Sequence, residues 1–214
     1  MEKKKKIALF GGAFNPPHRG HSAVVKALDS LDGIDEVWLM PSANRWDKAM
    51  TVSGPDRLRM IDLLIDDDHF RSRKPIRAFD HEVRKPNLST TYETKAELEK
   101  LYPYHEFFFV CGSDVVPDIP TKWVHGKELY ETTGFIFVDR PGSKPLSEMP
   151  MPNNFKIIEM KKGAAISSTL VRSLSADEAA LKEYLTPSVA EFITKKELYI
   201  EAIKKPLVKG AVIS

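Results

Sequence analysis

Three glycines, two prolines and two histidines fall within the stretch FGGAFNPPHRGH at positions 10–21. This stretch follows directly on the apolar run at 7–10, so it is predicted to leave a strand and enter a helix. Gly11 and Gly12 let a ligand approach the backbone where a Cβ would block it. His18 and His21 are three positions apart, which places both imidazoles on one side of a helix start. Backbone amides and imidazoles at such a turn predict a site for an anion such as phosphate.

A metal site and a purely structural role are the alternatives to phosphate binding for this stretch. The glycines match neither the GxGxxG pattern of dinucleotide-binding folds nor the GxxxxGK[ST] phosphate loop. Histidines are also metal ligands, but no third His, Cys or acidic neighbour stands at ligand spacing, so no metal site is expected. Each histidine could instead cap a helix or hydrogen-bond within the core. The two histidines inside a glycine loop favour the anion site.

The chain that positions this loop alternates between strands and helices. Apolar runs rich in β-formers predict strands at 7–10, 36–40, 76–79, 107–111, 135–138 and 156–160. Apolar spacing predicts helices at 21–31, 55–65, 91–101, 168–174, 177–184 and 187–198. The fold class is therefore α/β, a Rossmann-like parallel sheet with helices on both faces and a small C-terminal helical subdomain. We assign residues 1–165 to the nucleotide-binding core and 166–214 to a C-terminal helical region of the same domain.

Composition excludes several classes of protein. The 214 residues include 32 Lys and Arg against 30 Asp and Glu, and this balance argues against a general binder of nucleic acid or membrane surfaces. The apolar run behind MEKKKK is too short for a signal peptide, and no stretch has the length of a membrane span. Cys111 is the single cysteine, so no internal disulfide forms. We expect a cytoplasmic protein, and the sequence leaves open whether it is a homo-oligomer.

A second motif, ISSTLVR, stands at residues 166–172. Its Ser-Ser-Thr run suits a helix N-terminus, and Arg172 lies one turn further on, where its guanidinium can reach the same anion. GGAFNPPHRGH and ISSTLVR resemble the GGxFxPxHxGH and ISSTxxR motifs of the nucleotidyltransferases related to class I aminoacyl-tRNA synthetases. Along most of its length the chain is similar to the nicotinate/nicotinamide mononucleotide adenylyltransferases of that group.

Three further segments carry the resemblance to this branch. They are MPSAN at 40–44 with Lys48 and then RLRM at 57–60 behind it, STTY at 89–92, and CGSD at 111–114 with Trp123 behind it. An exposed Trp123 can stack on a pyridinium ring, and Asp114 can accept hydrogen bonds from ribose or adenine. The structural alternatives are core packing for Trp123, helix capping for Asp114 and the threonines, and a solvated Lys48.

The chain departs from the branch at two places. Residues 44–48 read NRWDK, where nicotinate-preferring members often carry a PPHK-like segment. Ala13 stands where Thr or Ser is often found, which removes a hydroxyl near the phosphates. The choice between the acid and the amide mononucleotide is therefore left open.

The resemblance implies a reaction and a set of roles. ATP would donate its adenylyl group to nicotinate or nicotinamide mononucleotide, giving a dinucleotide and pyrophosphate in NAD biosynthesis, with Mg²⁺ bound to ATP. The attacking phosphate is already an anion, so positioning and charge stabilisation would replace a general base. The implied catalytic residues are His18, His21 and Arg172; those for ATP are Gly11, Gly12, Ala13, Phe14, Asp114, Ser167, Ser168 and Thr169; those for the mononucleotide are Lys48, Thr91, Tyr92 and Trp123.

Three other functions stay open at this point. One is another nucleotidyltransferase, acting on phosphopantetheine or a CTP-linked substrate. A second is a nucleotide-sensing module on the same fold, which the intact His18, His21 and Arg172 disfavour. The third is an oxidoreductase that binds a preformed dinucleotide, which the absence of GxGxxG disfavours.

Overall fold

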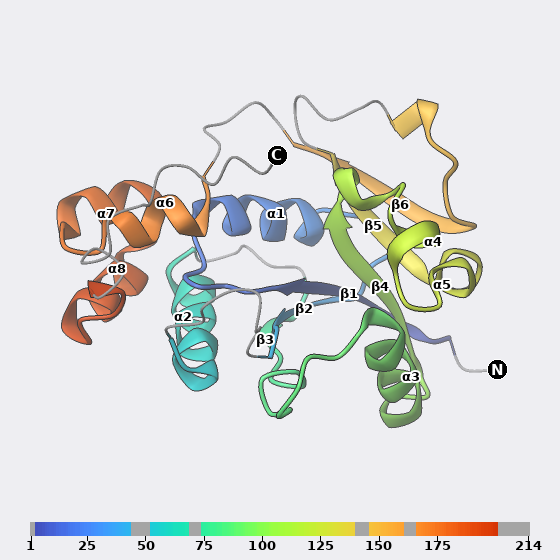
Figure 1. Ribbon diagram of the computed structural model, residues 1–214, viewed down its shortest axis with the longest axis horizontal. Coiled ribbons are helices and arrows are strands. Elements are labelled where there is room, and N and C mark those ends of the chain that lie inside the picture. Colours follow the sequence, from blue (N-terminus) through green and yellow to red (C-terminus); the bar gives the residue numbers. More distant parts are fainter. Residues whose placement is uncertain (1–2, 44–51, 69–73, 140–145, 161–165, 201–214) are drawn as a thin grey trace, which may run out of the picture.

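The computed structural model describes residues 3–43, 52–68, 74–139, 146–160 and 166–200. A six-stranded sheet has the order β3-β2-β1-β4-β5-β6, and each neighbouring pair is parallel (Figure 1). The strands are β1 (Lys5–Gly12), β2 (Glu36–Pro41), β3 (Ile76–Ala78), β4 (His105–Gly112), β5 (Gly134–Asp139) and β6 (Asn154–Glu159). The strand order reverses between β1 and β4, and open α/β sheets bind ligands beyond the carboxyl ends of the strands at such a point.

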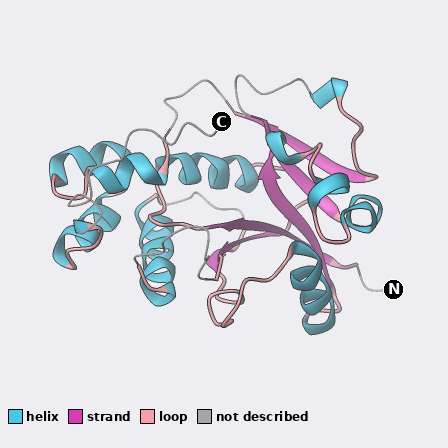
Figure 2. Ribbon diagram, viewed as in Figure 1, coloured by secondary structure: helices cyan, strands magenta, loops and turns pink. Residues whose placement is uncertain are grey.

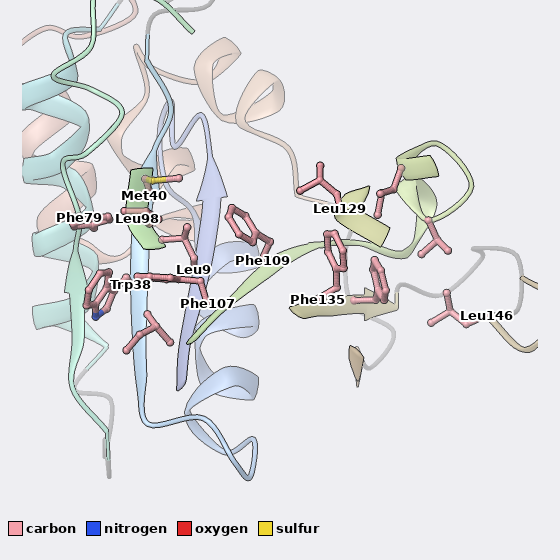
Figure 3. Close-up of a cluster of buried hydrophobic side chains, with 14 residues drawn as sticks. Leu9, Trp38, Met40, Phe79, Leu98, Phe107, Phe109, Leu129, Phe135 and Leu146 are labelled. Carbon is pink, nitrogen blue, oxygen red and sulfur yellow. The ribbon is translucent and has the colours of Figure 1, made fainter. Parts of the chain in front are cut away.

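Side chains of the inner strands alternate between two apolar clusters, as expected for a sheet that is covered on both faces. In β1, Ile7 and Leu9 join the first cluster, and Ala8 joins the second. Figure 3 shows the first cluster, in which Trp38 and Phe107 lie close together with ring centroids 5.6 Å apart. Because the inner strands are apolar on both faces, the short apolar runs in the sequence correctly predicted where the strands of the sheet lie.

Helices flank the strands on both sides (Figure 2). Val24 of α1 and Ile61 of α2 join the second cluster, whereas Leu98 of α3, Ile119 of α4 and Leu129 of α5 join the first. The helices are α1 (Arg19–Asp29), α2 (Gly54–Asp67), α3 (Thr91–Leu101), α4 (Ile119–Lys122), α5 (Gly126–Thr132), α6 (Ser168–Ser173), α7 (Glu178–Tyr184) and α8 (Pro187–Lys195), with short 3₁₀ turns at η1 (Ser113–Val115) and η2 (Leu146–Glu148). In the part of the chain that is described, no helix is long and apolar enough to cross a membrane.

Hydroxyl side chains fix where two of these helices begin. The Oγ of Ser53 accepts a hydrogen bond of 3.2 Å from the N–H of Asp56 at the start of α2. At the start of α3, Thr90 Oγ1 accepts from the N–H of Glu93 at 3.2 Å, and the Glu93 carboxylate accepts from the N–H of Thr90 at 2.8 Å. This capping box satisfies two amides that the helix itself leaves without partners.

The last three helices pack on the outer side of α2, and Figure 1 shows them gathered at one end of the molecule. Met60 and Leu64 of α2 form a third apolar cluster with residues of α6, α7 and α8. Asp67 fixes the start of α8, because its carboxylate accepts from the N–H and the Oγ of Ser188 at 2.7 and 2.6 Å. The division of the domain at residue 165 stays a prediction.

The predicted Rossmann-like α/β fold is confirmed, with two differences in detail. The short helices α4 and α5 were not predicted. Helix α8 ends at Lys195, earlier than the predicted residue 198, because Glu197 and Tyr199 have positive φ angles of 52° and 69°. Such angles cannot continue a right-handed helix of L-residues.

Candidate active site

The predicted phosphate loop leaves β1 at the centre of the sheet. Gly11 and Gly12 still pair with β2, and the chain then turns at Phe14, whose φ is +46°. The Phe14 ring is buried, and a Cβ added at Gly12 would lie 3.3 Å from it. A Cβ added at Gly11 would meet none of the described atoms within 4 Å. The backbone at Gly11 therefore borders open space, into which a ligand can approach.

The structure brings His18 and His21 together at the start of α1. His18 is the N-cap residue, and the two ring centroids are 3.8 Å apart. The N–H of His18 donates to Nδ1 of His21 at 3.1 Å. Because an accepting Nδ1 carries no proton, the proton of a neutral His21 lies on Nε2. This tautomer, inferred from the hydrogen bond, makes Nε2 a donor for an anion.

Other residues of the loop hold the two imidazoles in place. Phe10 and Phe14 lie against the His21 ring, with centroid distances of 5.9 and 4.9 Å. A Cβ at Gly20 would come within 3.0 Å of the His18 ring, so glycine at this position leaves room for that ring. The spacing of glycine, aromatic and histidine residues in the motif therefore has a geometric cause.

Helix α6 reaches this loop from the far end of the chain. Ser168 Oγ donates to the carbonyl of Pro16 at 3.0 Å, and Arg172 Nη1 donates to the carbonyl of Asn15 at 2.8 Å. Arg172 Nη2 also donates to Thr169 Oγ1 at 3.1 Å. The two motifs therefore lie together at the centre of the sheet, although the sequence separates them widely.

The predicted phosphate-binding hydroxyls of α6 all have partners within the protein. Ser167 is the N-cap residue, and its Oγ accepts from the N–H of Leu170 at 3.2 Å. Ser168 bonds to the loop and Thr169 to Arg172, as described above. The structure thus gives these residues a role in joining α6 to the loop, and their contact with phosphate stays a prediction.

Two side chains that hydrogen-bond to loop residues were not among the predicted site residues. Arg57 Nη1 donates to the carbonyl of Ala13 at 2.9 Å. The phenol of Tyr199 donates to Asn15 Oδ1 at 2.7 Å, across 184 positions of sequence. Both side chains are buried, and burial raises the pKa of the Tyr199 phenol, which therefore stays neutral.

A sequence signal existed for Arg57 and not for Tyr199. Arg57 precedes Met60, Ile61 and Leu64 by three, four and seven positions, so it shares the apolar face of α2, and the structure buries all four. An arginine in such a stripe is unusual, because charged side chains are rarely buried without a partner. Tyr199 follows a helix, and no local pattern relates it to a loop at the other end of the chain.

Asp114 lies where predicted, just after β4 at the same edge of the sheet. Its side chain is exposed, and a Cβ at Gly112 would collide with its Oδ1, so the glycine makes room for the carboxylate. Next to it, Ser113 Oγ donates to Asp139 Oδ1 at 3.0 Å and ties the end of β4 to the end of β5. Contact of Asp114 with ATP stays a prediction.

Of the residues predicted for the mononucleotide, Thr91 and Tyr92 lie at the start of α3, and Trp123 follows α4. Thr90 caps α3, which leaves Thr91 as its first helical residue. The Tyr92 ring stacks on His125, with centroids 4.2 Å apart and an interplanar angle of 28°. The Tyr92 phenol donates to Glu128 Oε1 at 3.3 Å, and the Glu128 charge raises the pKa of that phenol.

Trp123 ends α4 and is half-buried against the first apolar cluster, as is Tyr92. Trp123 therefore packs against the core, and its stacking on a pyridine ring stays a prediction. The chain then turns at His125, whose φ is +51°, before α5 begins. Lys48 lies outside the described residues, so its role stays a prediction.

The described residues include no group of three or more His, Cys, Asp or Glu side chains that could hold a metal ion. Cys111, at the end of β4, is half-buried, and burial raises the pKa of its thiol to about 12. Around the loop, the imidazoles of His18 and His21 and the guanidinium groups of Arg57 and Arg172 are hydrogen-bond donors, which suit an anion.

A parallel sheet with a histidine-bearing glycine loop and a Ser-Arg helix joined to it defines a nucleotidyltransferase. In agreement, a family model described as cytidylyltransferase-like matches residues 9–174. A "Probable nicotinate-nucleotide adenylyltransferase" of Shouchella clausii is 33% identical over 198 residues, which cover 91% of this chain and 97% of the relative. The protein of the same name from Oceanobacillus iheyensis is 33% identical over 196 residues, with the same shares covered. The chain belongs to the nicotinate-nucleotide adenylyltransferases of this family.

A solved structure gives the same result. The nicotinic acid mononucleotide adenylyltransferase of Plasmodium falciparum complexed with NaAD superposes with a TM-score of 0.75 at 28% identity. The match covers 91% of this chain and 97% of that one. The predicted family, fold and enzyme class are therefore confirmed.

Proposed function

We propose that this chain transfers the adenylyl group of ATP to nicotinate mononucleotide and releases pyrophosphate. One observation carries the proposal: α6 bonds to the phosphate loop through Ser168 and Arg172. A loop of backbone amides with imidazoles on one side and a guanidinium beside it is a site for a polyphosphate. The names of the relatives from Shouchella and Plasmodium support the acid form of the mononucleotide.

In this proposal the protein positions two anions and stabilises the charge that develops between them. The amides of residues 11–14 bind the nucleotide, and His18 and His21 face the triphosphate, with Nε2 of His21 as a donor. Ser168 and Arg172 hold the β- and γ-phosphates that leave as pyrophosphate. The mononucleotide phosphate attacks the α-phosphorus in line, and it needs no base because it is already ionised.

Magnesium enters this proposal as part of the substrate, MgATP. The described side chains offer no cluster that would bind the ion by themselves. Mg²⁺ commonly keeps several waters and binds through substrate phosphates, which is compatible with such a site. The side chains around the loop then add positive charge and hydrogen-bond donors to the same phosphates.

The mononucleotide is placed on the α3–α5 side of the site. Trp123 stacks on the pyridine ring, and Thr91 and Tyr92 offer polar edges to the base. Lys48 is assigned to the mononucleotide phosphate from the resemblance alone. We place the reaction in the cytoplasm, because a chain with a single cysteine can form no internal disulfide and suits a reducing compartment.

The test supplies ATP and Mg²⁺ with nicotinate mononucleotide, nicotinamide mononucleotide or phosphopantetheine in separate reactions and measures pyrophosphate. We expect release with nicotinate mononucleotide, and kcat/KM lower for the amide. Release with phosphopantetheine alone would assign the chain to another branch. No release with any of the three would leave the nucleotide-sensing alternative.

A further inference from the structure

Arg57 is a buried cation that the catalytic roles above do not use. It lies in the first turn of α2, and its side chain has no exposed surface. Nη1 donates to the carbonyl of Ala13 in the phosphate loop at 2.9 Å. Within the described part of the chain, Nε and Nη2 have no hydrogen-bond partner. A buried guanidinium normally has a carboxylate beside it, because removing a charge from water without a counter-ion is costly.

The neighbouring groups do not neutralise Arg57. Asp56 is next to it in sequence, but its carboxylate pairs with Lys196 and accepts from the Oγ of Ser53 at 2.9 Å. The pKa of Asp56 is lowered chiefly by its hydrogen bond with Lys196. The phenol of Tyr199 stays neutral because burial raises its pKa. Within the described residues, Arg57 therefore brings a full positive charge under the loop, since an arginine side chain stays protonated.

The Arg57–Ala13 contact links this charge to the loop. The carbonyl that Arg57 binds belongs to the Ala13–Phe14 peptide, whose N–H is one of the amides at the predicted phosphate site. A charged donor on the carbonyl polarises the peptide and strengthens its N–H as a donor. Two residues further along the loop, Arg172 donates to the Asn15 carbonyl in the same way.

We propose that Arg57 is a positioning residue that holds the phosphate loop and supplies it with buried positive charge, for which the nucleotide's phosphates are the counter-ion. The inference rests on the proposed function, because it takes the loop as a phosphate site. It explains why an arginine stands in the apolar stripe of α2. The unpaired charge of Arg57 destabilises the unliganded protein, and a bound polyphosphate offsets this destabilisation.

Two substitutions separate charge from hydrogen bonding. Arg57→Lys keeps the charge, and Arg57→Gln keeps a donor without charge. The matched control is Arg59→Gln, which removes an exposed arginine two residues further along the same helix. For each protein, Tm is measured with and without inorganic tripolyphosphate, and KM is measured for ATP and for the mononucleotide.

We expect tripolyphosphate to raise Tm in the parent protein, in Arg57→Lys and in Arg59→Gln. In Arg57→Gln, most of this increase in Tm should be lost. Removing one charged donor should raise the KM for ATP about tenfold in Arg57→Gln, with less than about a twofold change for the mononucleotide. The unliganded Arg57→Gln protein should melt close to the parent, because it no longer buries an unpaired charge.

Equal tripolyphosphate shifts in Arg57→Lys and Arg57→Gln would overturn the inference and leave the proposed function standing. A large loss of unliganded Tm in Arg57→Gln with a normal shift would also overturn it, since that is the behaviour of a purely structural residue. If tripolyphosphate stabilises the parent and Arg57→Lys but not Arg57→Gln, and no mononucleotide yields pyrophosphate, the inference stands and the proposed function fails.

Discussion

Replacing Arg172 by lysine keeps the charge at α6 and removes the planar fork. The guanidinium makes two hydrogen bonds, from Nη1 to the Asn15 carbonyl at 2.8 Å and from Nη2 to Thr169 Oγ1 at 3.1 Å. The ammonium of lysine is a compact group on a flexible stem and cannot reproduce both bonds. Losing one hydrogen bond from a charged donor costs about 1.5–3 kcal/mol. If that cost is paid when the loop adopts its binding geometry, kcat/KM for ATP falls about 10- to 150-fold.

The assay is continuous measurement of pyrophosphate release at varied ATP, with the mononucleotide saturating. Arg19→Lys is the matched control, because Arg19 is exposed, follows His18 directly, and donates through Nη2 to the Lys182 carbonyl at 3.3 Å. Its kcat/KM should change less than about twofold, as expected for a surface contact. A normal kcat/KM in Arg172→Lys would refute the view that the bond to Asn15 holds the loop for catalysis.

Three further predictions concern single residues. Gly11→Ala should change Tm by less than about 2 °C in calorimetry, because its Cβ meets none of the described atoms within 4 Å. The same variant should raise the KM for ATP in kinetic assays, and an unchanged KM would contradict a ligand at Gly11. Trp123→Ala should lower Tm and raise the KM for the mononucleotide about ten- to hundredfold, and Trp123→Phe should recover much of that affinity. Equal increases in the KM for ATP and in the KM for the mononucleotide would indicate that Trp123 only packs against the core. Because burial raises the pKa of the Cys111 thiol to about 12, Cys111 should react with iodoacetamide at pH 8 about a thousandfold more slowly in the native protein than in urea. Mass spectrometry measures both rates, and equal rates would show an accessible thiolate in the native protein.

The sheet and the two motifs were predictable from the sequence because their signals are local. A strand such as β1 is buried on both faces, so it is read from a short apolar run between polar residues. The loop is read from glycines and histidines at fixed spacing, and each has a local steric cause, as at Gly20 beside His18. The resemblance led us to expect that α6 and the loop serve the same anion. The direct hydrogen bonds from Ser168 and Arg172 to the loop carbonyls were not predicted, since spacing alone does not relate residues 15 and 172.

The features that were missed depend on distant contacts or on very short elements. Helices α4 and α5 have 4 and 7 residues, too few for a clear apolar period, so the helical setting of Trp123 was not predicted. Arg57 was visible as an odd charge in an apolar stripe, but its meaning depends on the carbonyl of Ala13. Tyr199 meets Asn15 only through the tertiary fold, and no local rule of sequence places them together.

The bond between Asn15 and Tyr199 spans 184 positions and therefore has a consequence for biosynthesis. A ribosome adds about 5–20 residues per second, so the loop is synthesised roughly 10–40 s before Tyr199 exists. During that interval the nascent chain can form β1 and α1, but Asn15 still lacks its hydrogen bond with the Tyr199 phenol. Because contacts between distant residues also slow refolding, we expect catalytic activity to be regained after most of the secondary structure. We therefore expect the loop to reach its final geometry only after Tyr199 has met Asn15.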